Sequence, residues 1–97
     1  MDVRKAAEAA RDYLVSIHRE FHQHPELSMQ EFRTAQRIEE ELDRLGIPHT
    51  RVGETGVLGT LRGEKEGGRA VVLRADIDAL PVEEENDLPF KSEVPGV

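Results

Sequence analysis

The sequence contains no cysteine, and this absence excludes several kinds of site. The 97-residue chain can hold no disulfide, no thiolate metal ligand and no cysteine nucleophile. Its longest uninterrupted apolar run, Ala70 to Leu73, is far shorter than the ~20 residues that a membrane span needs. The first eighteen residues include three acids and no apolar block, so no secretory signal is visible. We therefore expect a soluble, cytoplasmic protein with no membrane partner.

Positive charge is also scarce in this chain. Thirteen Lys and Arg residues stand against twenty Asp and Glu residues, which gives a net charge of −7. Proteins that bind nucleic acids hold phosphates with basic side chains, so this balance predicts no nucleic-acid partner. Residues 76–97 carry −6 of the total, with Lys91 as their one base. Because charge runs are usually exposed, we expect a solvated loop there.

Two amphipathic helices are predicted in the first half of the chain. Apolar residues recur at helical spacing from Val3 to Phe21, and Asp2 is suited to cap the first helix. Pro25 disfavours helical geometry in the residue before it, which predicts an end near His24.

The second helix is expected to follow at once. Residues 28–31 form a capping box at its start. Gly46 suits the left-handed position that ends a helix, and Pro48 prevents continuation. The buried stripe of this helix is predicted to be Phe32, Ala35, Ile38, Leu42 and Leu45.

After Gly46 the pattern changes to that of strands. We expect an extended stretch over 47–52, a turn at 53–56, a strand over 57–62 and a hairpin loop over 63–68. The best strand is 69–76, whose continuous apolar centre predicts burial on both faces, as in an α/β sheet. Such a strand needs helices on both sides, and only two helices are available. The predicted class is therefore α/β, with two helices before a mixed sheet, as the opening part of a larger domain.

Two groups of residues could carry chemistry. His18 and His22 lie four apart on one helix, a spacing used for zinc, although histidines at such a place more often cap and line the helix end. Asp76 and Asp78 follow the best strand on one face, where paired carboxylates can bind a cation or orient a metal-bound histidine. The alternative is that Arg74 and these acids form a structural cluster at a turn.

Several segments resemble one enzyme family when they are taken in order. The most specific block is Arg-Ala-Asp-Ile-Asp-Ala-Leu-Pro at 74–81, and the others are 21–28, Glu31, 55–63, 82–84, 88–92 and 95–97. From Tyr13 to Val97 the chain resembles the N-terminal part of the N-acyl-amino-acid amidohydrolases. These form the hippurate-hydrolase and auxin-conjugate-hydrolase branch of the aminoacylase-type metallopeptidases.

The resemblance implies a two-domain enzyme of which residues 1–97 are the N-terminal part of the catalytic domain, without the smaller lid domain. It implies hydrolysis of the amide bond of a small N-acyl amino acid at two divalent metal ions, which are zinc, manganese, cobalt or nickel. The metals polarise the carbonyl and generate hydroxide, while a Glu is the general base. The resemblance also allows the enzyme to form a homo-oligomer.

The family's first metal ligands are expected in a His-Ala-Cys-Gly-His-Asp segment directly after Val97. The resemblance therefore implies no metal ligand and no bound metal in this chain, which alone should be inactive. Asp76 matches an Asp that orients a metal-binding His elsewhere in the wider clan, and Arg74 stands at the position of that His. The other hypothesis is a stand-alone, non-catalytic binding or interaction module built on the same fold opening.

Overall fold

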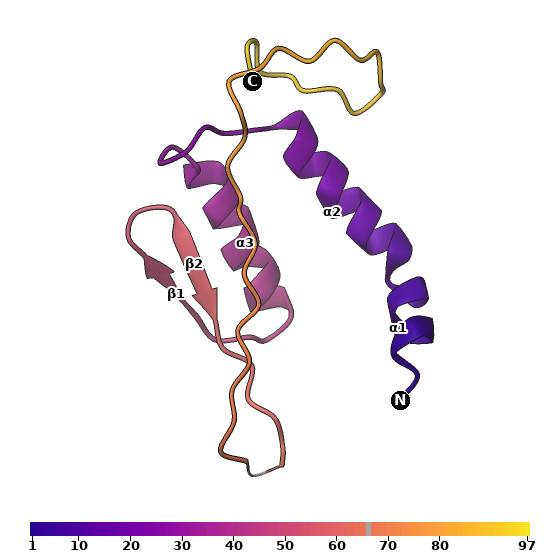
Figure 1. The fold of residues 1–97 in the computed structure, drawn as a ribbon, viewed down its shortest axis with the longest axis vertical. Coiled ribbons are helices and arrows are strands. Elements are labelled where there is room, and N and C mark those ends of the chain that lie inside the picture. The colour runs from indigo at the N-terminus through magenta and orange to yellow at the C-terminus, as the bar shows by residue number, and fades with distance from the viewer. Residues whose placement is uncertain (66) are drawn as a thin grey trace. The chain divides into compact units, whose positions relative to one another are not determined.

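A computed structural model describes residues 1–65 and 67–97. The described residues form two compact units, one of residues 1–25 with 80–97 and one of residues 26–79. The helices and strands, drawn in Figure 1, are α1 (Val3–Ala9), α2 (Arg11–Gln23), α3 (Phe32–Arg44), β1 (His49–Val52) and β2 (Gly56–Gly59).

The first predicted helix is divided into α1 and α2. Asp2 caps α1 as expected, because its side chain accepts a hydrogen bond from the backbone N–H of Lys5 at 3.2 Å. The division falls at Ala10, whose N–H is shared between the carbonyls of Ala6 and Ala7 at 3.2 Å each. A shared bond of this kind tightens a last helical turn. The predicted end is confirmed, since α2 closes at Gln23.

The start of α3 differs from the prediction. The helix begins at Phe32 rather than at the expected capping box, because Met29 adopts a left-handed φ of 68° that no helix accommodates. The Glu26 carboxylate caps it instead, accepting the backbone N–H groups of Thr34 at 2.6 Å and Arg33 at 3.1 Å. Burial alone would raise the pKa of Glu26. The hydrogen bonds from Thr34 and Arg33 and the Arg33 charge outweigh burial and hold this pKa below its ordinary value.

Substituting Glu26→Ala should therefore destabilise α3. Two backbone donors lose their acceptor, and loss of such a cap costs about 1 kcal/mol of the free energy of unfolding. Because the pKa is lowered, the stabilisation is complete above the ordinary pKa of Glu and is lost as the pH falls through the lowered value. Urea denaturation at several pH values should show the two proteins converging in acid. Glu40→Ala, at an exposed position on the same helix, should have little effect at any pH.

The end of α3 follows the prediction. Gly46 has a φ of +72°, which glycine adopts without strain. The N–H of Gly46 bonds to the carbonyl of Asp43 at 3.0 Å, and that of Ile47 bonds to the carbonyl of Leu42 at 2.9 Å. These two bonds define the Schellman motif, which turns the chain from α3 toward β1.

Strands β1 and β2 form an antiparallel hairpin on which α3 packs. His49 pairs with Gly59 and Val52 pairs with Gly56, so the predicted turn lies between them. The predicted strand over 57–62 is shortened to β2. Of the predicted buried stripe, Ala35 is fully buried, but Phe32 and Leu45 are each 52% exposed, so the prediction is wrong for these two. The core of this unit is therefore thin.

The prediction of a buried strand over 69–76 is wrong for this structure, which assigns it no strand. Val71, Val72 and Leu73 are 87%, 83% and 94% exposed. A strand exists only through hydrogen bonds to a neighbour, and no described residue supplies one here.

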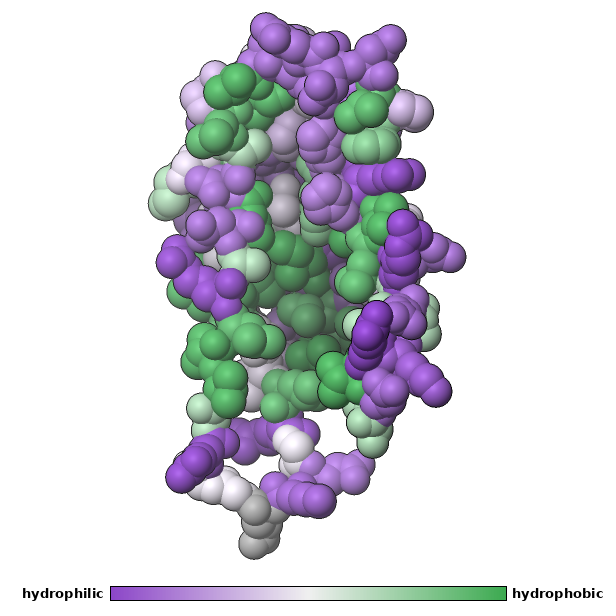
Figure 2. Space-filling view, turned by 45° about the vertical axis from the view of Figure 1, so that its right-hand side comes forward, coloured by the Kyte–Doolittle hydropathy of each residue, from purple (hydrophilic) through white to green (hydrophobic). Residues whose placement is uncertain are grey.

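The hairpin loop expected at 63–68 includes residue 66, which lies outside the described residues. Figure 2 shows that the face it views carries extensive apolar surface.

The described helices are all too short or too polar to cross a membrane. The cytoplasmic location stays a prediction.

Candidate functional site

His22, near the end of α2, forms a polar contact with the loop that follows residue 80. His22 Nε2 lies 2.9 and 3.0 Å from the two carboxylate oxygens of Glu84, 62 residues away in sequence. Glu84 also accepts the backbone N–H of Ser92 at 2.8 Å. His18 lies exposed and is not part of this contact. We call the three residues His22, Glu84 and Ser92 the clasp.

Further contacts surround the clasp. The ring of Phe90 stands edge-on to His22 with centroids 5.7 Å apart, and the Arg19 guanidinium lies 4.4 Å from the centre of that ring. The carbonyl of Gln23 accepts the backbone N–H of Glu93 at 2.8 Å. The acidic segment is thus not a uniformly solvated loop as expected, because it is fastened to the end of α2 and the Glu84 side chain is only 11% exposed.

The clasp carboxylate is held in its charged form. The backbone N–H of Ser92 and then the His22 imidazole hold the pKa of Glu84 below its ordinary value. A lowered pKa means that the clasp stabilises the loop above the ordinary pKa of Glu and releases it as the pH falls through the lowered value.

Substituting Glu84→Gln should loosen the loop without unfolding α2. A neutral amide accepts hydrogen bonds more weakly than a charged carboxylate does, and its NH2 group replaces one of the two accepting oxygens, so protection of the Ser92 amide against hydrogen exchange should fall. The wild-type chain should lose the same protection in acid, and the variant should show no such pH dependence. Glu85→Gln is the matched control, since Glu85 is exposed. Equal protection in all three proteins would contradict this role for the clasp.

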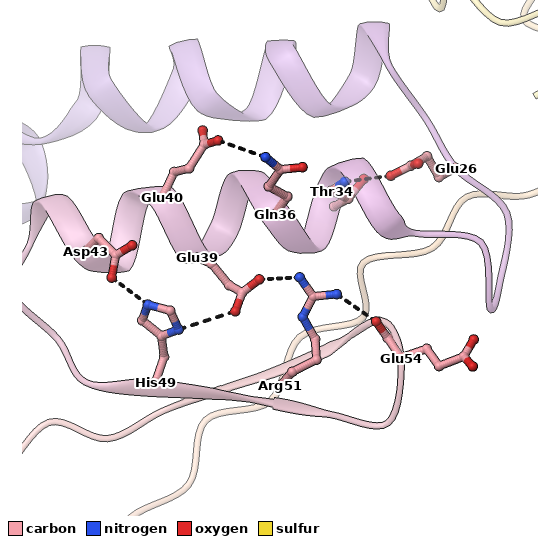
Figure 3. A network of polar contacts seen from close by, with 9 residues as sticks. All are labelled: Glu26, Thr34, Gln36, Glu39, Glu40, Asp43, His49, Arg51 and Glu54. Atoms are coloured by element: carbon pink, nitrogen blue, oxygen red, sulfur yellow. Dashed lines mark hydrogen bonds and ion pairs between the residues drawn. The ribbon is translucent and has the colours of Figure 1, made fainter.

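A second polar network joins α3 to β1 in the unit of residues 26–79 (Figure 3). His49 lies between two acids of α3, with Nε2 2.7 Å from Asp43 Oδ1 and Nδ1 3.5 Å from Glu39 Oε2. Arg51 pairs with Glu39 and also donates to the carbonyl of Glu54 at 2.6 Å. The network fixes β1 against the helix. The sequence did not predict this network, because the spacing of its residues matches no known motif.

Asp76 is not part of either network. Its carboxylate is 72% exposed and pairs with the Arg74 guanidinium, with Nη2 3.1 Å from Oδ1. Asp78 is also exposed. The supporting role expected for Asp76 stays a prediction.

Glu31 has an unusual environment for an acid. It is 7% exposed, and among the described residues its Oε1 atom is buried without a hydrogen-bond donor. A buried acceptor left unpaired costs about 1–3 kcal/mol, more when it is charged. In the sequence, Glu31 stands out as the acid of the predicted capping box and as part of the family resemblance.

The described residues do not assemble a metal centre. Within residues 1–65 and 67–97, no three His, Cys, Asp or Glu side chains are placed to hold an ion together. This chain's own residues therefore do not fit a dinuclear site, and no catalytic step through a metal is assigned to them.

Comparison with known proteins identifies the family. No protein-family model matches the chain. It is 49% identical over 88 residues to thermostable carboxypeptidase 1 of Saccharolobus solfataricus, covering 89% of this chain and 22% of that protein. It is 41% identical over 96 residues to the N-acetylcysteine deacetylase of Bacillus subtilis, covering 94% and 24%. The crystal structure of Bacillus subtilis YXEP, described as a dinuclear metal binding peptidase from the M20 family, matches with a TM-score of 0.84 and 40% identity. Over nearly all of its own length, the chain is therefore homologous to M20 peptidases and amidohydrolases.

The match to YXEP covers 92% of this chain and 25% of that one. The chain spans about a quarter of the length of the curated relatives that it matches. The recognition of an N-terminal segment of this M20 family is confirmed, and so is the α/β class in which helices precede strands.

Proposed function

We propose that this chain is the first part of the catalytic domain of a metal-dependent amidohydrolase that cleaves the amide bond of N-acyl amino acids. The observation that carries the proposal is the match to a dinuclear metal peptidase at a TM-score of 0.84 and 40% identity. The similarity to an N-acetylcysteine deacetylase supports an N-acyl amino acid as the substrate class. The ion pair of Arg74 and Asp76 lies in the most specific block of the resemblance. We include Asp76 as a residue that supports the metal centre without binding a metal.

The proposal assigns structural tasks to the residues of this chain. The Glu26 cap and the Schellman turn fix the two ends of α3, and the network of His49 and Arg51 fixes β1 against it. The clasp fastens the segment of residues 82–97 to α2. Residues 1–97 would therefore shape one side of the catalytic domain, while the metal-binding residues lie in a part of the enzyme that this chain does not contain.

A fusion protein tests this function. In it, the 97 residues replace the matching quarter of the Bacillus subtilis N-acetylcysteine deacetylase, to which they are 41% identical. We expect the fusion protein to release amino acid from N-acetylated amino acids when zinc, manganese or cobalt is added, and to cleave dipeptides poorly. The 97-residue chain alone should release none.

Two results would contradict the proposal. Turnover by the chain alone that survives purification and is abolished by a chelator would show that it is not part of a larger active unit. A folded fusion protein that releases no amino acid from N-acetylated amino acids would show that this chain cannot replace the corresponding part of such an enzyme.

A further inference from the structure

His49 is a largely buried histidine whose two ring nitrogens both face acids of α3 (Figure 3). It is the first residue of β1, and its side chain is 15% exposed. Nε2 lies 2.7 Å from Oδ1 of Asp43, and Nδ1 lies 3.5 Å from Oε2 of Glu39. These two acids stand four residues apart and therefore share one face of the helix. The imidazole ring thus links the strand to two places on α3.

This arrangement suits a charged imidazole. A neutral ring has one N–H donor, and its other nitrogen carries a lone pair. With a neutral ring, one of the two carboxylates would therefore face a lone pair instead of a donor. The Nδ1 atom of His49 is buried and, within the part of the chain that the structure describes, has no hydrogen-bond partner. A ring with both nitrogens protonated directs an N–H toward each acid and leaves neither nitrogen against a negative charge.

The charges around the ring favour the same state. Among the described residues, Glu39 and Asp43 are the acids that face the ring, and Arg51 is the cation beside it, paired with Glu39. Glu54 joins this network through its backbone carbonyl, and the partner of His49 on β2 is a glycine, which adds no charge. With a neutral His49 the two acids and one base leave a net charge of −1. A charged His49 brings this sum to zero.

We propose that His49 is a proton-controlled latch between β1 and α3. Histidine changes its charge between about pH 8 and about pH 5. A proton on His49 adds ion pairs that exist only in the folded state, so the folded state gains stability as the pH falls through this range. The latch is strongest near about pH 6, weakens toward about pH 8 as the proton leaves, and fails in stronger acid when Glu39 and Asp43 are neutralised. The inference is independent of the proposed function, because all of these residues belong to the unit of residues 26–79.

Hydrogen exchange at two pH values tests the latch in the 97-residue chain. The reporter is the amide of Thr60, which donates to the carbonyl of Pro48, next to His49, at 2.9 Å. Each rate is divided by that of an unstructured peptide at the same pH, which removes the direct effect of pH on exchange. We expect protection of Thr60 to be about two- to fivefold higher at about pH 6 than at about pH 8, the range that partly exposed ion pairs supply. Equal or lower protection at the lower pH would overturn the proposal.

His49→Gln should remove this pH dependence. Glutamine keeps an N–H donor for Asp43 but takes up no proton, so protection of Thr60 should be equal at the two pH values. His18→Gln, at an exposed histidine outside the network, is the matched control and should keep the wild-type rise. A rise that survives in His49→Gln would come from another group and would overturn the proposal.

Asp43→Asn gives a second test that leaves the buried ring in place. The Asp43 side chain is 73% exposed, so this substitution should leave the fold intact. It removes one of the two negative charges that the ring faces, and the rise in Thr60 protection toward the lower pH should therefore shrink. Glu40→Gln, at an exposed acid of the same helix, should keep the full rise. A full rise in Asp43→Asn would show that the ring does not act through this acid, and would overturn the proposal.

Discussion

Replacing Gly56 with alanine should open the β1–β2 hairpin. A Cβ at this position would lie 2.6 Å from the carbonyl oxygen of Val52, its partner across the turn. A carbon atom cannot approach a backbone oxygen so closely, and a backbone oxygen cannot rotate away as a side chain can. The strands must separate, at a cost of about 1–3 kcal/mol of the free energy of unfolding. Urea denaturation should show a lower midpoint, and NMR contacts between Thr50 and Leu58 should weaken.

Gly63→Ala is the matched control for this substitution. Gly63 has nothing within 4 Å of its hypothetical Cβ and no positive φ, so alanine there should be neutral or slightly stabilising. The contacts of His49 with Asp43 and Glu39 depend on β1 and should be lost together with the hairpin in Gly56→Ala. An unchanged midpoint in Gly56→Ala would show that the close approach at Val52 is not a feature of the folded protein.

The parts of the fold that local sequence determines were predicted well. Asp2 and Gly46 act on residues within four positions of themselves, and both were assigned the cap positions that they occupy. Pro25 acts on the residue before it, and α2 ends where this predicts. Short-range rules succeed here because the physical causes are short-range.

Features that depend on distant partners could not be predicted. Glu26 caps α3 from seven and eight residues before its donors, and the capping-box rule considers only three. The contact between His22 and Glu84 joins residues 62 apart, so the helical spacing of His18 and His22 could not predict it. The 69–76 segment has the composition of a buried strand, but composition does not say whether the neighbouring strands lie in the same chain.

Val72→Lys, in the segment of residues 69–76, should have opposite effects on the 97-residue chain and on the fusion protein. In the 97-residue chain Val72 is 83% exposed, so the free energy of unfolding should change by less than about 0.5 kcal/mol. A lysine beside an open strand edge also blocks association, so soluble yield should rise. In the fusion protein with the deacetylase the same ammonium would be buried in a two-sided sheet. The expected cost there is on the order of 4 kcal/mol or more, with loss of folded, active enzyme.

Val3→Lys separates burial from the general effect of an added charge. Val3 is 74% exposed at the start of α1, so lysine there should be tolerated in both proteins. Soluble yield and sedimentation measure the effect in the chain, and the urea midpoint and amide hydrolysis measure it in the fusion protein. If Val72→Lys unfolds the 97-residue chain, the segment is already buried there and residues 1–97 form a complete domain. If it is harmless in both proteins, the segment stays on the surface of the whole enzyme, and its apolar run needs another explanation than burial in the sheet.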